Sequence, residues 1–204
     1  MNFEITGIIL AGGQSKRMGY NKALAKLKGK PLIEYSLNAL RGVTGNIVLS
    51  VGSEMFQYKN LPSVTDIIPG CGPVGGIWSA LRYSTTVLNL VISCDMPFIP
   101  VPLLKLLVKE AEEYGAPITL PVDSKGCLQP LCAVYNQSIL PLFNEAVIQK
   151  KLRLMDLISE AGMRQIKPDQ SHDLFSTGNF FNMNTPADLK NAEDQWYPDM
   201  FDDD

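Results

Sequence analysis

Three short segments carry residues whose types and spacing could do chemistry on a phosphorylated substrate. The first is GGQSKRMGYNK, which begins at Gly12 and follows an apolar run. Glycines let backbone N–H groups approach a polyanion without an obstructing Cβ, and lysine and arginine add positive charge. We therefore expect this loop to bind phosphates through Gly12, Gly13, Arg17 and Lys22.

Two common phosphate-binding patterns do not fit this loop. The Walker A pattern GxxxxGK[ST] cannot be aligned with it, and GxGxxG is missing, so a nicotinamide-dinucleotide site loses its main support. A simpler alternative is a tight turn at the glycines followed by a solvated hairpin. We favour the solvated hairpin for Lys26, Lys28 and Lys30, and phosphate binding for the loop before them.

The second segment is the glycine-rich turn PGCGPVGGIWSAL, which follows a short apolar run and leads into a helical pattern. Gly75 and Gly76 near the start of that helix would let a nucleotide base or phosphate come close. In isolation, a simple tight connection explains this turn equally well. Two such turns at successive strand ends favour a nucleotide cleft more than either does alone.

The third segment is LVISCDMPFIP, where Asp95 stands at the exit of an apolar strand and two prolines fix the backbone beyond it. Mg²⁺ prefers one or two carboxylates together with phosphate oxygens and water, which suits a single well-placed aspartate. The alternative is that Asp95 caps the following helix, a contribution of about 1 kcal/mol. The two glycine turns favour metal binding.

The elements that must position these segments alternate along the first half of the chain. Apolar runs within 6–11, 46–52, 63–68 and 88–95 are typical of strands, and helical spacing covers 32–41, 75–83 and 102–114. This alternation indicates an α/β fold with a single doubly wound, mostly parallel, Rossmann-like sheet. Ligands of such sheets bind outside the carboxyl ends of the strands.

The second half is less regular, and we expect it to extend the sheet and build another wall of the cleft. Its strand candidates lie in 116–122 and 128–135, and its helix candidates in 136–150 and 153–161. NTPADLKNAE predicts a helix capped by Thr185, with Asp188 at the capping-box position. One domain over 1–192 follows, nucleotide-binding first and acceptor-binding second, with an acidic tail over 193–204.

Composition limits the class of protein. A chain of 204 residues, 46% of them hydrophobic, can bury the core of one large α/β domain, and a net charge of -3 argues against nucleic-acid binding. We find no membrane-span or signal-peptide pattern and expect a cytoplasmic protein. The four cysteines form no CxxC pair and should be reduced, and the sole histidine, His172, is expected to be solvated.

Five motifs, LAGGQSKRMGYNKAL, GPVGGI, SCDMPFIP, QPLCAVY and FNMNTPADL, occur in this order over nearly the whole chain. Together they resemble the molybdenum cofactor guanylyltransferase family, whereas LAGG alone marks only the wider nucleotidyltransferase superfamily. The resemblance implies a nucleotidyltransferase fold, Mg²⁺ as cofactor, and GTP and molybdopterin or Mo-molybdopterin as substrates. GMP would be transferred to the terminal phosphate of the pterin, pyrophosphate released, and the dinucleotide cofactor passed on to molybdoenzymes or their chaperones.

The resemblance also implies roles for single residues. It assigns GTP and Mg²⁺ to Asp95, the GTP phosphates to Lys22, a nucleotide contact to Asp66, and the guanine and phosphate site to Leu10, Ala11, Gly12 and Gly13. An asparagine is frequent in the family where Ser50 stands, which puts a nucleotide contact there in question. Asn182 and Asn184 match the segment that faces the pterin, and in an extended segment their side chains would point to the same side.

The implied reaction needs no general base. The acceptor is a phosphate monoester with a second pKa of about 6, so it is mostly dianionic at neutral pH. Because two polyanions must meet, Mg²⁺ on Asp95 together with Lys22 and Arg17 would neutralise charge and align the attack on the α-phosphorus.

Other activities fit the motifs less well. Molybdopterin cytidylyltransferases tend to have LAAG in place of LAGG and lack the GPVGGI turn, and sugar-phosphate nucleotidyltransferases usually carry longer sugar-binding segments. A nicotinamide-dependent dehydrogenase would need its fingerprint. A nucleotide-binding adaptor without turnover is the alternative from another class, and the intact Lys22 and Asp95 argue against it.

Overall fold

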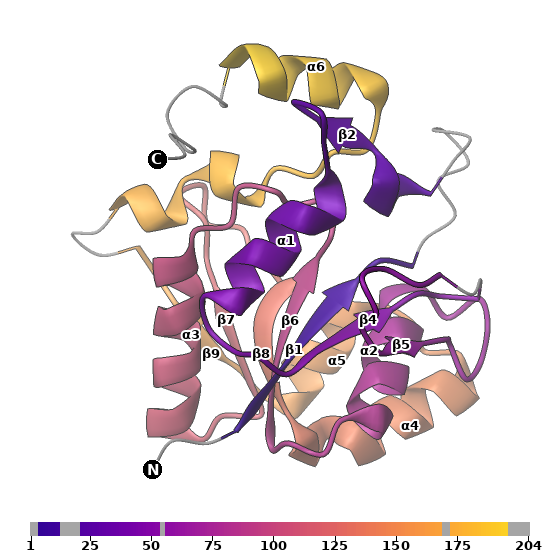
Figure 1. Ribbon diagram of the computed structural model, residues 1–204. Coiled ribbons are helices and arrows are strands. Elements are labelled where there is room, and N and C mark those ends of the chain that lie inside the picture. The colour runs from indigo at the N-terminus through magenta and orange to yellow at the C-terminus, as the bar shows by residue number, and fades with distance from the viewer. Residues whose placement is uncertain (1–3, 13–20, 54–55, 169–171, 196–204) are drawn as a thin grey trace.

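A seven-stranded sheet in the order β5-β4-β1-β6-β8-β7-β9 forms the centre of the molecule (Figure 1). The structure is a computed structural model that describes residues 4–12, 21–53, 56–168 and 172–195. β8 runs antiparallel to β6 and β7, and the other neighbouring strands of this sheet are parallel, which confirms the predicted mostly parallel α/β fold. The strands are β1 (Ile5–Leu10), β4 (Ile47–Ser50), β5 (Ser63–Val64), β6 (Leu88–Ser93), β7 (Ile118–Pro121), β8 (Cys132–Asn136) and β9 (Arg164–Ile166).

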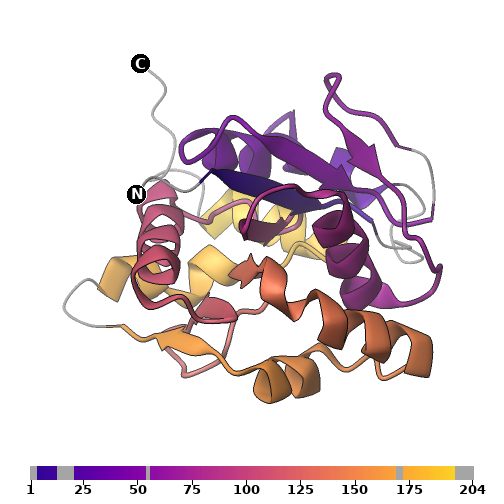
Figure 2. The same cartoon turned by 90° about the horizontal axis from the view of Figure 1, so that it is seen from below.

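Helices cover both faces of the sheet. One hydrophobic cluster joins it to α1 (Leu32–Arg41) and α3 (Val101–Tyr114), and a second joins it to α2 (Gly72–Tyr83), α4 (Leu140–Gln149) and α5 (Leu154–Ala161) (Figures 1 and 2). α6 (Pro186–Gln195) packs apart from the sheet on a hairpin of β2 (Lys26–Leu27) and β3 (Lys30–Pro31). Four short 3₁₀ helices complete the described elements: η1 (Lys22–Leu24), η2 (Gln137–Ile139), η3 (His172–Phe175) and η4 (Thr177–Phe180).

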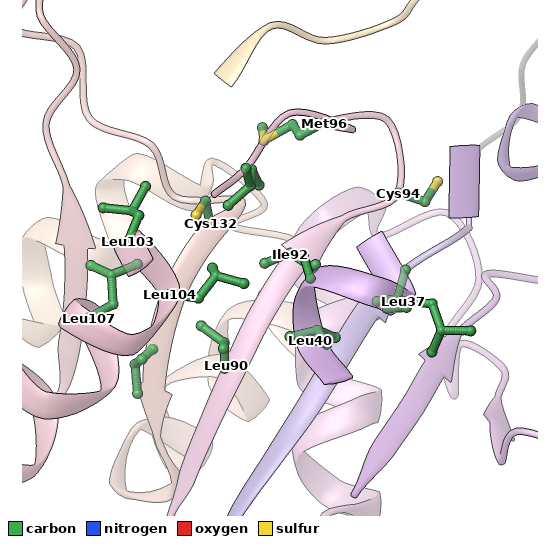
Figure 3. Close-up of a cluster of buried hydrophobic side chains, with 14 of the residues drawn as sticks. Leu37, Leu40, Leu90, Ile92, Cys94, Met96, Leu103, Leu104, Leu107 and Cys132 are labelled. Carbon is green, nitrogen blue, oxygen red and sulfur yellow. The ribbon is translucent and has the colours of Figure 1, made fainter. Parts of the chain in front are cut away.

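Strand β6 shows why the apolar runs are continuous. Leu90 and Ile92 point toward the leucines of α1 and α3, whereas Val91 belongs to the cluster on the opposite face (Figure 3). Because successive side chains of a strand alternate between faces, a strand covered on both sides needs apolar residues at every position. Each such buried aliphatic side chain contributes about 1.5–3 kcal/mol, which fixes the strand between the two helical layers.

The chain reverses its direction of winding at β1. From β1 it passes to β4 on one side, and after β5 it returns to β6 on the other side. In the ladder, Leu10 pairs with Ser50 of β4 and with Ser93 of β6, so the three strands end level with one another. A parallel sheet leaves a crevice at such a switch point, outside the carboxyl ends of its strands.

Several predicted elements differ from the observed ones at their ends. The run expected over 63–68 forms only the two-residue β5, and β9 was not predicted. α6 continues to Gln195, so the boundary expected at 192 falls inside it, and residues 196–204 of the acidic tail lie outside the described residues. The hairpin favoured for Lys26 to Lys30 is confirmed. Within the described residues, no helix is long and apolar enough to cross a membrane.

Candidate active site

A cleft of about 770 Å³ opens at the carboxyl ends of β1, β4 and β6. Because β4 and β6 flank β1 in the sheet, one wall comes from the end of β6 with the start of η1, and the opposite wall from the end of β4, the segment after β5 and the start of α2. The end of β1 lies between the two walls. The predicted site residues that line it are Leu10, Ala11, Gly12, Lys22, Ser50, Asp66, Gly76, Asp95 and Asn184. Residues far apart in sequence therefore meet in one place, as the strand-end argument predicted.

Gly12, which follows β1, lies against the backbone that follows β4. A Cβ on Gly12 would stand 2.4 Å from the backbone N of Gly52, a separation that non-bonded atoms do not tolerate. Glycine was expected here for close approach to a polyanion. The structure supplies a second reason, because the neighbouring backbone itself leaves no room for a side chain.

The first wall of the cleft carries a charged cluster. Lys22 Nζ forms an ion pair with Asp95 Oδ2 and donates a second hydrogen bond of 2.6 Å to Asn184 Oδ1. Asp95 Oδ1 is buried and has no hydrogen-bond partner among the described residues. The capping alternative for Asp95 is wrong, since α3 begins only after Pro100. One carboxylate oxygen therefore holds the lysine while the other stays available.

The opposite wall carries Asp66, which follows β5. Its backbone N donates to Gly52 O over 2.7 Å, and its Oδ1 is buried without a hydrogen-bond partner within the described chain. Burial raises the pKa of Asp66 above its ordinary value. A buried acceptor without a donor is costly, so this carboxylate is suited to receive donors from a ligand.

Ser50 and Gly76 stand beside Asp66. Ser50 Oγ donates to Gly76 O over 3.3 Å, and a Cβ on Gly76 would come within 3.0 Å of that hydroxyl and 3.8 Å of Asp66 Oδ1. Gly76 therefore keeps this part of the cleft open. Gly75, one residue earlier on α2, is not among the residues that line the cleft, and a Cβ there would meet the Cys71 side chain at 2.6 Å.

Cys94 also lines the cleft, next to Asp95. Burial first, and then the Asp95 charge, raise the pKa of the Cys94 thiol to about 12. The thiol is therefore protonated at neutral pH and offers no thiolate nucleophile.

The remaining predicted residues divide into two groups. Asn182 is not among the residues that line the cleft, and its Nδ2 donates to Phe180 O over 3.5 Å. Gly13 and Arg17 lie outside the described residues, as does the side chain of His172.

Sequence reasoning missed part of the lining. The unpredicted residues are Gly52, Ser53, Gly70, Gly72, Pro73, Ser93, Cys94 and Leu131. A signal existed for the glycines, because Gly52 follows an apolar run and Gly70 and Gly72 belong to the second glycine-rich turn. Leu131 lies in the motif QPLCAVY, but its place in the cleft depends on the pairing of β8 with β6, which the motif does not reveal.

The donor set fits a hard divalent cation held mainly by a substrate. No group of three or more histidine, cysteine or acidic side chains gathers as a metal cage in the described ranges. The buried, unpartnered Asp95 Oδ1 supplies one carboxylate oxygen at the cleft. Mg²⁺ is typically bound by one or two carboxylates together with substrate phosphates and water, so this oxygen suits it.

Comparison with known proteins gives consistent matches. Residues 7–165 match the family described as the MobA-like NTP transferase domain. The chain is 32% identical over 188 residues to a "probable molybdenum cofactor guanylyltransferase" of Carboxydothermus hydrogenoformans, which covers 92% of this chain and 94% of the relative. It is 31% identical over 192 residues to the "molybdenum cofactor guanylyltransferase" of Yersinia pestis strain Pestoides F, with 92% and 94% covered.

A solved structure extends the match to three dimensions. Molybdopterin-guanine dinucleotide biosynthesis protein A of Archaeoglobus fulgidus superposes with a TM-score of 0.78 at 27% identity. The match covers 93% of this chain and 97% of that chain, so the likeness extends over most of both chains.

Proposed function

Since the chain belongs to the MobA-like NTP transferase family, we propose that it transfers GMP from Mg-GTP to the terminal phosphate of molybdopterin or Mo-molybdopterin. Pyrophosphate is the leaving group, and the product is a molybdopterin guanine dinucleotide cofactor. The chain is a nucleotidyltransferase, and its acceptor, its metal and its residue roles are the content of the proposal.

One observation carries the proposal. The two walls of a single cleft offer opposite chemistry, with Lys22 and Asp95 on one side and Asp66 beside Gly76 on the other. A triphosphate needs cations, and a guanine edge presents N–H donors that a carboxylate can accept. A nucleotide spanning the cleft would satisfy both walls at once.

Asp66 is proposed to read the base. The N1–H and N2–H groups of guanine are adjacent donors, and an ionised carboxylate is an acceptor only. Cytosine presents an acceptor at N3, which would face the carboxylate without a proton between them. The buried, unpartnered Oδ1 of Asp66 therefore favours guanine over cytosine.

Lys22 and Asp95 are proposed to hold the triphosphate. The lysine ammonium has three N–H donors, and two of them go to Asp95 and Asn184, which leaves the third for a phosphate oxygen. A divalent ion on Asp95 Oδ1, Mg²⁺ in this proposal, would supply further neutralisation of the phosphate charge when bound. Arg17 is proposed to add charge from the loop before η1.

The transfer itself requires orientation more than proton chemistry. An oxygen of the acceptor phosphate forms a bond to the α-phosphorus while the bond from that phosphorus to the bridging oxygen of pyrophosphate breaks. The acceptor is already dianionic at neutral pH, with a second pKa of about 6, so no residue has to remove a proton. What the chain contributes is alignment and charge from Lys22 on the reacting phosphates.

The test is a nucleotide panel with purified molybdopterin, scored for dinucleotide product and for released pyrophosphate. GTP should give both products, and CTP, ATP and UTP little of either. Dinucleotide formed from CTP in preference to GTP would make the chain a cytidylyltransferase. Tight GTP binding without pyrophosphate would make it an adaptor. Cytoplasmic location and transfer of the product to molybdoenzyme chaperones complete the proposal.

A further inference from the structure

The segment just before α6 contacts Lys22 and Asp95, the two charged residues on the first wall of the cleft. Met183 N donates to the backbone carbonyl of Asp95 over 2.9 Å, and Asn184 Oδ1 accepts from Lys22 Nζ over 2.6 Å. Two consecutive residues of one segment therefore fasten a strand exit and a lysine that lie far away in the sequence. The position of Lys22 therefore depends on the contacts that hold this segment in place.

Asp188, in the first turn of α6, holds this segment. Its Oδ2 accepts from the backbone N of Asn184 over 2.8 Å and from that of Thr185 over 2.7 Å, while Asp188 N donates to Thr185 Oγ1 over 3.1 Å. The predicted capping box is thus confirmed, with an additional bond to Asn184. Asp188 is not among the residues that line the cleft.

A small hydrophobic cluster fixes α6 relative to the rest of the site. It joins Ala25 and Leu27, which follow Lys22 in the chain, to Phe98, which follows Asp95, and to Met183 and Leu189 at α6. The three segments that carry the charged cluster therefore share one packed core. A displacement of α6 would move Asn184 relative to Lys22.

The contacts of α6 restrict the orientation of the Lys22 ammonium. A lysine side chain is flexible, and its ammonium can rotate among many directions. With Asp95 on one side and Asn184 on the other as fixed acceptors, the third N–H has one remaining direction. Loss of either acceptor would leave the charge in the cleft but would free its orientation.

We propose that Asp188 is a positioning residue for Lys22, acting through Asn184, so that the α6 cap tunes the affinity of the nucleotide half of the cleft. The proposal rests on the proposed role of Lys22 at the GTP triphosphate. It also assigns Asn184 a second task beside the pterin contact that the family resemblance implies.

A double-mutant cycle on the full chain tests it, with GTP affinity measured by calorimetry in the absence of divalent metal. Asp188→Ala should weaken GTP binding about five- to tenfold, whereas Asp188→Asn keeps an acceptor oxygen and should stay within about twofold. In a Lys22→Ala background, Asp188→Ala should change GTP affinity by less than about twofold. An equal loss in both backgrounds would overturn the proposal.

A matched cap elsewhere separates positioning from stability. Asn136 Oδ1 accepts from Ser138 N over 2.9 Å at the start of η2, and Asn136 pairs with Leu88 at the amino-terminal end of β6, whereas the cleft lies at the carboxyl end of that strand. Asn136→Ala should lower the thermal midpoint and leave GTP affinity unchanged. A parallel loss of affinity in Asn136→Ala would show that general loosening explains the effect.

A substitute variant and the GTP affinity of the parent chain distinguish the possible results of this cycle. If Asp188→Ala does not fold, Asn184→Ala removes only the acceptor for Lys22 and enters the same cycle with the same expected coupling. A parent chain that does not bind GTP even with Mg²⁺ present would contradict the proposed function. A parent that binds GTP tightly but gives an additive cycle would contradict only the positioning role.

Discussion

Asp66 and Asp95 stand on opposite walls of one cleft, and each has one buried oxygen without a hydrogen-bond partner among the described residues. They differ in their second oxygen and in their surroundings. Asp95 Oδ2 accepts from the Lys22 ammonium, which brings a full positive charge to that wall. Asp66 has no ion pair in the described part of the chain, and burial raises its pKa.

The difference teaches how one cleft can recognise two parts of a nucleotide. A carboxylate beside a cation can lie close to a metal ion and to phosphate groups, because the charges of the two side chains nearly cancel. A carboxylate without a cation attracts neutral N–H donors and repels phosphates. In the proposed function, the position of Lys22 would therefore direct the triphosphate to its own wall and the base to the other.

The largest effect is expected from Asp95→Asn. The amide keeps the shape but removes the charge proposed to hold Mg²⁺, so turnover should fall on the order of 10³-fold with folding nearly intact. Steady-state kinetics of pyrophosphate release at saturating Mg²⁺ would measure it. As a control, Glu110→Gln breaks the partly buried ion pair with Arg164 away from the cleft and should leave turnover unchanged. Near-parental turnover of Asp95→Asn would contradict the metal role.

Lys22→Ala should have the next largest effect. Loss of a charged hydrogen bond to phosphate costs about 1.5–3 kcal/mol, which corresponds to a roughly 10- to 150-fold weaker affinity. GTP and CTP should lose affinity alike, because the lysine meets the part that they share. Lys26→Ala on the β2–β3 hairpin is the matched control and should have little effect. A change in preference for GTP over CTP, at unchanged affinity, would break the proposed division between the walls.

Asp66→Asn should affect the wall of the cleft that is proposed to bind the base. The amide can accept only on one atom and presents donors on the other, so the preference for GTP over CTP should fall about 5- to 30-fold, or 1–2 kcal/mol. Competition binding with the two nucleotides would measure this ratio. If both affinities fell equally and the ratio stayed constant, Asp66 would serve the phosphates or the fold and not the base.

The smallest effect is on stability and depends on pH. Because the pKa of Asp66 is raised in the folded chain, the folded state binds more protons than the unfolded state between the ordinary value of 3.8 and the raised value. The free energy of unfolding therefore falls as pH rises through that window. Asp66→Asn should be more stable than the parent at neutral pH, and this gain should disappear toward pH 4.

Urea unfolding across a pH series would measure the gain. Asp156 is exposed on α5 and provides the control, since Asp156→Asn should show no such pH-dependent difference. A constant difference between Asp66→Asn and the parent at every pH would show that burial of the Asp66 charge is not its cause.

The sequence alone determined the features that depend on neighbouring residues. The bounds of α1 were predicted in full, because apolar spacing and local propensity agree there. The capping box was predicted because Asp188 follows Thr185 by three positions in the sequence. The placement of Asp95 at a strand exit followed from the apolar run before it. The continuous apolar strands also predicted a parallel sheet, with its ligand site outside the carboxyl ends of the strands.

Only the tertiary structure decided which of these residues meet and which way they face. Gly75 and Gly76 are adjacent in sequence, but successive residues of a helix point about 100° apart, so only one of them faces the cleft. β9 has only three residues and too little pattern to be recognised, because it is stabilised by pairing with β7. Asn184 reaches Lys22 because a small core packs α6 on the hairpin, and such long-range packing leaves no signal in the local sequence.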